Sequence, residues 1–171
     1  MTGGRRIARS WRESRPGAPA ADRETVAALA ARIGTASQAR LGRSLALLHV
    51  DAGSCGGCEL ELRALASVFH VLERLGLRFA TTPRHADVML VTGPATRNLA
   101  DAVQQAYAAM ADPKWVVAIG DCAVDGGVFK GSYAVLGGIA PLVAVDLAIP
   151  GCPPKPEQIL AGLRALLEAN A

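Results

Sequence analysis

The chain has 171 residues, of which 51% are hydrophobic and 19% charged, a composition that excludes disordered and collagen-like proteins. Aromatic residues make up 4%, too few to favour base stacking on single-stranded nucleic acid, and no apolar run has the length of a membrane span. The net charge of +3 is unevenly divided: residues 1–43 carry nine arginines and three acidic residues, and residues 44–171 carry nine basic and twelve acidic residues. We therefore expect a basic N-terminal extension, either a solvated tail or an arm for a membrane surface or acidic partner, before a mildly acidic domain.

The basic extension, residues 1–43, divides into two parts. Glycines and prolines interrupt any periodic pattern in residues 1–21, whereas apolar residues recur at helical spacing between Asp22 and Gly34. These patterns predict an irregular arm followed by a short amphipathic helix. The pair Arg5 and Arg6 resembles the start of a twin-arginine export signal, but the next residues are polar and contain prolines, so we do not expect export.

From residue 44 onward, apolar runs of strand length alternate with helical patterns. Near-continuous apolar runs predict strands that are buried on both faces, as in a parallel sheet. The four clearest runs cover residues 44–50, 87–92, 115–120 and 144–149, and a weaker one covers residues 77–80. Helical patterns lie between them at residues 58–75, 95–111 and 156–169. This alternation predicts a doubly wound α/β domain with a parallel sheet over residues 44–171.

Four cysteines follow the strands of this predicted sheet. Cys55 and Cys58 form a C-x-x-C after the first strand, and Cys122 and Cys152 each follow a later strand. Because ligands bind at the carboxyl ends of the strands in an open parallel sheet, we expect the four thiols to converge. Glycines beside the cysteines let the backbone approach closely. Four converging thiolates suit either a four-coordinate metal ion or a cubane iron–sulfur cluster.

Other arrangements of the four cysteines are compatible with the sequence. They could be unrelated buried thiols, or they could form two disulfides, which the lack of an evident export signal disfavours. They could also hold a structural zinc ion. Zinc sites usually contain two short C-x-x-C pairs, and this chain has one, so the spacing favours an iron–sulfur cluster while zinc stays open.

Three motifs of the chain together resemble one family. They are C-G-G-C-E-L-E at residues 55–61, G-D-C-A at residues 120–123 and I-P-G-C-P-P-K-P-E at residues 149–157. Over about residues 44–168 the chain resembles the 20-kDa subunit of NADH:quinone oxidoreductase. It resembles even more the small subunit of membrane-bound, energy-converting nickel–iron hydrogenases, including the formate hydrogenlyase type. The C-G-G-C motif favours this hydrogenase branch, because the quinone branch typically has two adjacent cysteines there.

The resemblance implies a flavodoxin-like fold and one [4Fe-4S] cluster on Cys55, Cys58, Cys122 and Cys152. It implies an electron-transfer subunit of an oxidoreductase complex, with no substrate chemistry of its own. The implied partners are a large catalytic subunit with a nickel–iron centre, a ferredoxin-like iron–sulfur subunit and membrane subunits, and no nucleic acid. These partners would hold the chain at the cytoplasmic face of the cell membrane. The alternatives are the equivalent subunit of a quinone-reducing complex and, from another class, a zinc-stabilised interaction module.

One carboxylate near the cysteine pair is a candidate for proton transfer. Glu61 matches a position where the family commonly has a carboxylate, and a carboxylate beside a cluster can carry protons coupled to electrons. The alternative is that Glu59 and Glu61 only favour the N-terminal end of a helix. The aspartates near the cysteines are interpreted as turn formers, namely Asp51, Asp121 and Asp125. The histidines are interpreted as packing or surface residues, namely His49, His70 and His85.

Overall fold

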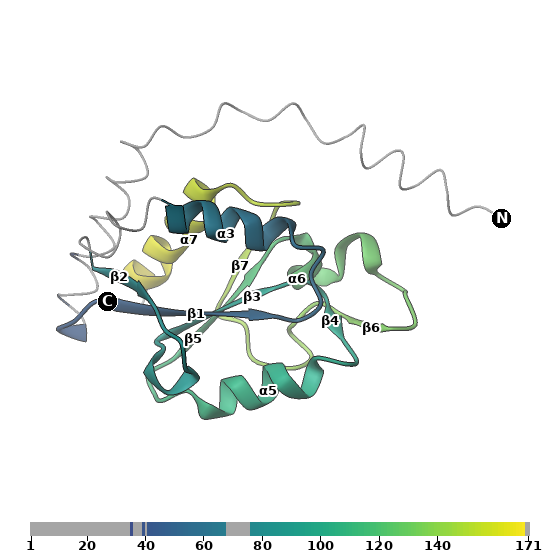
Figure 1. Cartoon of the computed structure of the whole chain (residues 1–171), viewed down its shortest axis with the longest axis horizontal. Helices are drawn as coiled ribbons and strands as arrows, with labels where there is room; N and C mark the ends of the chain where they lie inside the picture. The colour runs from purple at the N-terminus through teal and green to yellow at the C-terminus, as the bar shows by residue number, and fades with distance from the viewer. Residues whose placement is uncertain (1–34, 36–38, 40, 68–75, 170–171) are drawn as a thin grey trace.

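The computed structural model describes Thr35, Ala39 and residues 41–67 and 76–169 (Figure 1). The predicted helix of the basic extension, His70 and the end of the first helix predicted in the domain lie outside these residues. Within the described ranges, no helix combines the length and hydropathy that a membrane crossing requires. The first strand begins at Leu45, next to the boundary expected between the extension and the domain.

Five parallel strands form the central sheet in the order β2-β1-β3-β5-β7. The strands are β1 (Leu45–Asp51), β2 (Leu77–Phe79), β3 (Val88–Thr92), β5 (Trp115–Ile119) and β7 (Leu147–Ile149). Counted along the chain within this sheet, the order is the 2-1-3-4-5 of flavodoxin-like folds. The predicted doubly wound parallel sheet is therefore confirmed, including the weak second strand.

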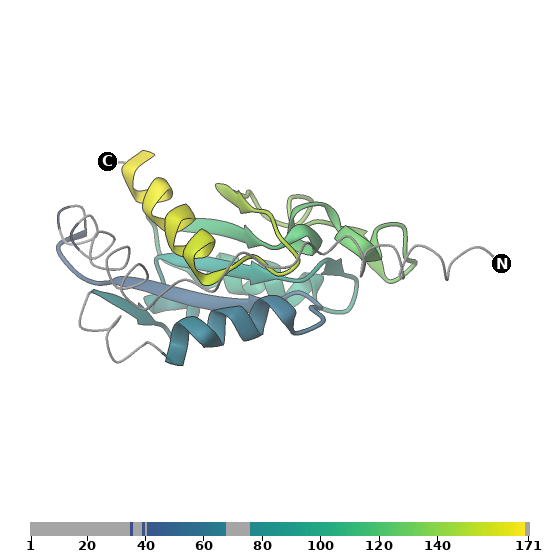
Figure 2. The ribbon, with the colours of Figure 1, turned by 90° about the horizontal axis from the view of Figure 1, so that it is seen from above.

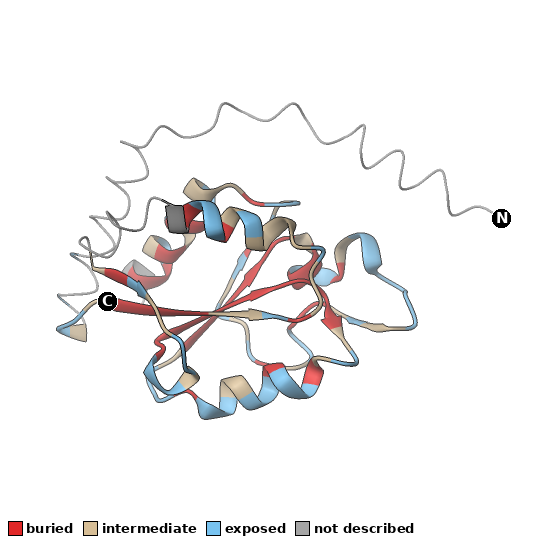
Figure 3. Ribbon diagram, in the orientation of Figure 1, coloured by how far each residue is buried: buried red, intermediate tan, exposed pale blue. Residues whose placement is uncertain are grey.

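Helices cover both faces of this sheet (Figures 1 and 2). The helices α3 (Gly57–Ser67) and α7 (Pro156–Ala169) pack over one face, where leucines of both helices and Ile159 of α7 meet the strands. Helix α5 (Ala100–Ala109) packs over the other face through Val103. Every residue of β3 and β5 is buried, as their near-continuous apolar sequences predict (Figure 3).

Three short elements differ from the sequence-based expectation. The helix predicted from residue 95 begins at Ala100, because Ala95–Thr96 forms β4 and pairs antiparallel with β6 (Val135–Gly137). The helix α6 (Asp121–Asp125), which follows β5, was not predicted, since five residues are too few to show a helical period. Strand β7 is shorter than the apolar run, because the side chain of Asp146 accepts the backbone N–H of Val116 where the ladder would continue.

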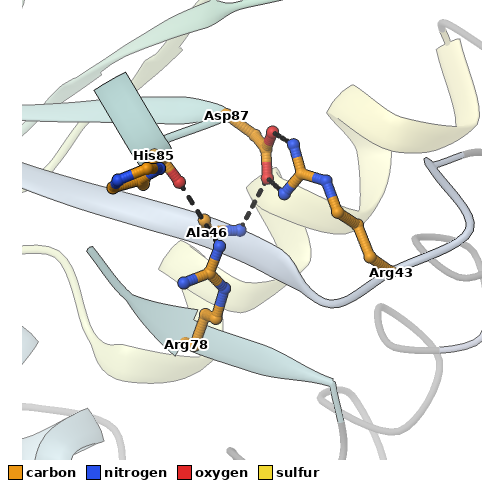
Figure 4. Close-up of polar contacts among 5 residues, drawn as sticks. All are labelled: Arg43, Ala46, Arg78, His85 and Asp87. Carbon is orange, nitrogen blue, oxygen red and sulfur yellow. Dashed lines mark hydrogen bonds and ion pairs between the residues drawn. The ribbon is translucent and has the colours of Figure 1, made fainter. Parts of the chain in front are cut away.

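Aspartate side chains accept backbone N–H groups of neighbouring strands at the amino ends of the sheet. Asp87 donates its backbone N–H to the carbonyl of Ala46 and accepts the N–H of Ala46 on its carboxylate, both at 2.8 Å. The guanidinium of Arg43 donates to both oxygens of the same carboxylate, whose side chain is 4% exposed (Figure 4). Asp146 forms the same reciprocal pair with Val116 at 2.9 and 2.7 Å. Each aspartate thus replaces one backbone carbonyl of the parallel ladder with a side-chain oxygen.

Candidate metal centre

All four cysteines lie at the carboxyl edge of the sheet, as the sequence predicts. Cys55 lies between β1 and α3, Cys58 in the first turn of α3, Cys122 in α6 after β5, and Cys152 between β7 and α7. All four are free thiols, so the disulfide alternative does not hold in this structure. Cys122 is buried, Cys58 is partly buried, and Cys55 and Cys152 are exposed. The site therefore begins in the interior and opens at the surface.

Glycines leave room for sulfur between the loops of this edge. A Cβ placed on Gly120 would lie 2.6 Å from the Sγ of Cys58 and 3.3 Å from the carbonyl oxygen of Gly151. Gly120 therefore brings the thiol of Cys58 against the loops that carry Cys122 and Cys152. A Cβ on Gly127 would lie 2.9 Å from the Sγ of Cys122. Both glycines have positive φ, so any side chain there would meet strain as well as sulfur.

Aspartates fix the backbone of the cysteine loops. Asp51 accepts the N–H groups of Gly53 at 2.9 Å and Ser54 at 2.6 Å, which shapes the turn before Cys55. Asp125 accepts the N–H of Gly127 at 2.9 Å and also binds Lys130 at 3.1 Å. These contacts agree with the prediction that both are turn formers.

Asp121 has a different partner from these two turn formers. It donates its N–H to the carbonyl of Gly151 at 2.9 Å, and its carboxylate accepts the N–H of Gly151 at 2.8 Å. The interpretation of Asp121 as a local turn former is therefore wrong, because its partner lies 30 residues away in the loop of Cys152.

The thiols oppose one another's ionisation. Burial, followed by the charges of Cys122, Cys152, Cys55 and Asp121, raises the pKa of Cys58 to about 12. Burial is also the main cause that raises the pKa values of Cys122 and Cys152, and neighbouring thiols add to both shifts. A hydrogen bond from the backbone N–H of Val128 acts in the opposite direction on the pKa of Cys122. Four thiolates at this edge consequently need a cationic centre to compensate their charge.

The donor set and the glycine cradle fit an iron–sulfur cluster. The donors are sulfur alone, the ligand type of such clusters, and the backbone N–H of Val128 supplies a hydrogen bond to one of the sulfurs. Within residues 41–67 and 76–169, no three side chains of the types His, Cys, Asp or Glu are gathered closely enough to hold a single metal ion. The fit to a cluster therefore rests on the sulfur donors and on the room that the glycines leave around them.

The other predicted site residues lie around helix α3. Glu61 is partly buried in this helix, three residues after Cys58. Glu59 lies in the first turn, where the helix dipole favours a carboxylate, and it binds Arg63 at 2.8 Å. His49, interpreted as a packing residue, is partly buried in β1, and its Nε2 lies 2.8 Å from the Oγ1 of Thr92 in β3. Burial lowers the pKa of His49 against the opposing charges of Glu59 and Asp51.

Large apolar side chains are exposed in the segments that follow Cys58 and Cys122 in the chain. Val128 is 65% exposed and Tyr133 is 91% exposed, and both lie in the segment that follows Cys122. The remaining exposed members are Leu60, Val124, Phe129 and Leu136. We call these six residues the apolar rim. The sequence did not reveal the rim, because most of its members lie in elements of five residues or fewer, which are too short to show a periodic pattern. Its exposure fits a surface that a protein partner covers.

Two comparisons identify relatives by sequence. The family model of the NADH ubiquinone oxidoreductase 20-kDa subunit matches residues 55–166, a range that contains all four cysteines. A probable membrane-bound hydrogenase subunit, mbhJ, from Pyrococcus furiosus is 42% identical over 131 residues. The match covers 77% of this chain and 78% of that protein.

Two solved structures are similar in three dimensions. One is a chain of the membrane-bound sulfane sulfur reductase, an archaeal respiratory membrane complex, with 29% identity and a TM-score of 0.66. The match covers 81% of this chain and 74% of that chain. The other is a chain of an NAD⁺-reducing [NiFe]-hydrogenase, with 22% identity, a TM-score of 0.57 and coverage of 74% and 93%, respectively. This second match bears on the fold alone.

Proposed function

The chain belongs to the family of the NADH ubiquinone oxidoreductase 20-kDa subunit, and from this premise we propose that it transfers electrons in a membrane-bound nickel–iron hydrogenase complex. Its relatives are subunits of oxidoreductase complexes, and this chain is such a subunit. The identity of 42% to a membrane-bound hydrogenase subunit supports the hydrogenase branch, as does the C-G-G-C motif. The formate hydrogenlyase type is part of the proposal.

We propose that Cys55, Cys58, Cys122 and Cys152 hold one [4Fe-4S] cluster. The observation that carries this proposal is the position of the Cys58 thiol over Gly120, between the loops of Cys122 and Cys152. When bound, such a cluster supplies one-electron oxidation and reduction. Gly120 and Gly127 keep side chains out of the space around the sulfurs, and the N–H of Val128 stabilises negative charge on Cys122. The exposure of Cys55 and Cys152 puts this edge within reach of a partner's redox group.

The partner that covers this edge is, in our proposal, the large catalytic subunit with the nickel–iron centre. Five of the six residues of the apolar rim follow Cys122 within 14 residues of the chain, and such a subunit would bury them. A ferredoxin-like iron–sulfur subunit would exchange electrons with this chain, and membrane subunits would hold the assembly at the cytoplasmic face of the cell membrane. The relatives from membrane-bound complexes support this peripheral location. The basic extension, residues 1–43, and the cluster domain, residues 44–171, are the two proposed units.

Glu61 is proposed as a proton-transferring residue beside this cluster. Its place in α3, three residues after Cys58, supports the proposal, because a carboxylate that close to a redox centre can take up a proton as an electron arrives.

The second candidate is the equivalent subunit of a quinone-reducing complex. The matched family model, which describes a quinone enzyme's subunit, favours it. Metal analysis of the complex purified anaerobically on this chain separates the two. Nickel together with iron and acid-labile sulfide supports the hydrogenase, whereas iron and sulfide without nickel support the quinone reductase. One zinc ion without sulfide supports the zinc-stabilised module and contradicts both redox functions.

Substitution Cys152→Ser tests the ligand assignment. In the anaerobically purified complex, we expect one [4Fe-4S] electron paramagnetic resonance signal to disappear or to become a [3Fe-4S] signal, since a serine oxygen binds iron poorly in place of a thiolate. The matched control is Ala148→Ser, which adds a hydroxyl at an exposed position of β7, four residues earlier. An unchanged [4Fe-4S] signal in the Cys152→Ser complex would contradict the assignment.

A further inference from the structure

Asp121 and Gly151 join the loops of two proposed cluster ligands. Asp121 directly precedes Cys122, and Gly151 directly precedes Cys152. The two residues form a reciprocal pair, in which the N–H of Asp121 donates to the carbonyl of Gly151 at 2.9 Å and the N–H of Gly151 donates to the carboxylate at 2.8 Å. Two hydrogen bonds therefore fix the distance between the backbones from which both cysteines extend.

The same reciprocal pair occurs at the opposite edge of the sheet. Asp87 with Ala46 and Asp146 with Val116 each replace a carbonyl of the parallel ladder with a carboxylate oxygen. Strands β5 and β7 are thus joined by an aspartate at both ends. At the carboxyl end the N–H of Gly120 donates to Ile149 at 2.8 Å, and the pair of Asp121 and Gly151 comes next.

Only glycine fits at position 151, so this residue has no side chain of its own that could hold the loop. Its φ is +141°, and a Cβ there would lie 2.7 Å from the Cα of Pro154. The residue before Cys152 is thereby confined to glycine, which has no side chain to hold the loop. The carboxylate of Asp121, at the end of the neighbouring strand β5, binds the N–H of Gly151 and holds the loop instead.

The carboxylate of Asp121 also lies close to the proposed ligands. Asp121 directly precedes Cys122, and its carboxylate accepts the N–H of Gly151, which directly precedes Cys152, so its charge is held between the loops of these two cysteines. Asp121 is partly buried, and one oxygen of its carboxylate accepts the N–H of Gly151, so the negative charge is held at a fixed place near the sulfurs. A fixed negative charge near an iron–sulfur cluster disfavours the reduced form, which carries one more electron.

We propose that Asp121 is a positioning residue for the cluster, which clamps the loops of Cys122 and Cys152 together and lowers the midpoint potential of the bound cluster through its negative charge. This inference rests on the proposed [4Fe-4S] site. Asparagine at this position would keep an oxygen acceptor for the N–H of Gly151 without the charge, and alanine would remove both. The two variants therefore separate the clamp from the charge.

The test compares Asp121→Asn and Asp121→Ala in the anaerobically purified complex by redox titration followed by electron paramagnetic resonance. For Asp121→Asn we expect full iron and sulfide content and a midpoint potential above that of the unsubstituted complex. For Asp121→Ala we expect iron to be lost to a chelator about tenfold faster, as one charge-assisted hydrogen bond is removed. Asp146→Asn is the matched control, because it changes the same kind of hydrogen-bonded pair at the amino edge of the sheet. Neither the midpoint potential nor the rate of iron loss should change in this variant.

Hydrogen exchange at Gly151 gives a readout that depends on the clamp alone. Its N–H should exchange slowly in the unsubstituted chain and in Asp121→Asn, and faster in Asp121→Ala. An unchanged potential in Asp121→Asn would overturn the charge effect, and unchanged exchange and iron loss in Asp121→Ala would overturn the clamp. If the unsubstituted complex contains no cluster in this chain, the proposed function fails as well. A cluster that is present but insensitive to both variants overturns this inference alone.

Discussion

The amino and carboxyl edges of the central sheet have the same strands but different chemistry. At the amino edge, Asp87 is bonded to Ala46 and Arg43, and its buried carboxylate has partners for both oxygens. The carboxyl edge has glycines with positive φ and thiols that oppose one another's ionisation, and the apolar rim begins in the segments that follow these thiols. The amino edge thus stabilises the fold, whereas the carboxyl edge is locally less stable and provides a site and a partner surface.

This division follows from the geometry of parallel strands. The loops at the carboxyl edge connect strands to the helices that cross over the sheet, and side chains from distant parts of the sequence meet there. Glycine in these loops costs stability, because it loses more backbone freedom on folding than other residues. The amino edge has no comparable need for room, so polar side chains can bond fully to the ladder ends.

The largest effect is expected from filling the glycine cradle. Gly120→Ala places a Cβ 2.6 Å from the Sγ of Cys58, so this sulfur must move and most of the iron and sulfide should be lost. The measurement is the iron and sulfide that this chain carries when native mass spectrometry releases it from the purified complex. Gly131→Ala is the matched control, since Gly131 has nearly the same φ of +83° but nothing within 4 Å of its added Cβ. Equal cluster content in the two variants would show that the cradle has no role.

The next effect is expected at the amino edge. Asp87→Ala leaves the buried N–H of Ala46 without its acceptor and removes the carboxylate that Arg43 binds. We therefore expect the free energy of unfolding to fall by about 2–4 kcal/mol. Chemical denaturation measures this change, and the spectrum of the bound cluster should stay the same. The exposed carboxylate of Asp112 provides the control, because Asp112→Ala should change stability by less than about 0.5 kcal/mol. An altered cluster spectrum in Asp87→Ala would contradict the separation of the two edges.

The smallest effect concerns the thiols of the metal-free chain. Because the pKa of Cys58 is raised from 9.0 to about 12, this thiol should react with iodoacetamide at pH 9 about tenfold or more slowly than Cys55. Mass spectrometry of the alkylated peptides measures both rates. The unfolded chain ionises this thiol above pH 9 while the folded chain keeps its proton until about pH 12. The stability that the protonated thiol contributes is therefore complete below pH 9 and is lost as the pH rises toward 12. Equal alkylation rates would show that Cys58 is not shielded.

The parts of the fold that depend only on the local hydrophobic pattern could be predicted from the sequence. The apolar strands β3 and β5 and helix α7 follow from hydrophobic pattern alone, and the cysteines could be placed at one edge because each follows a strand. Strand β4 could not be found, because its two residues continue a helical pattern and gain strand geometry only by pairing with β6. Two side-chain contacts could not be predicted either, since each joins residues 30 or more positions apart in the sequence. They are the pair of Asp121 with Gly151 and the contact of His49 with Thr92.

The central claim is that the carboxyl edge holds one [4Fe-4S] cluster on four cysteines. Native mass spectrometry of the complex purified anaerobically, with this chain released in the gas phase, measures directly what the chain carries. We expect the mass of the chain plus about four iron and four sulfide atoms, and the loss of that added mass in Gly120→Ala. A chain that carries a single zinc ion, or no added mass in an intact complex, would show that these cysteines do not hold the cluster.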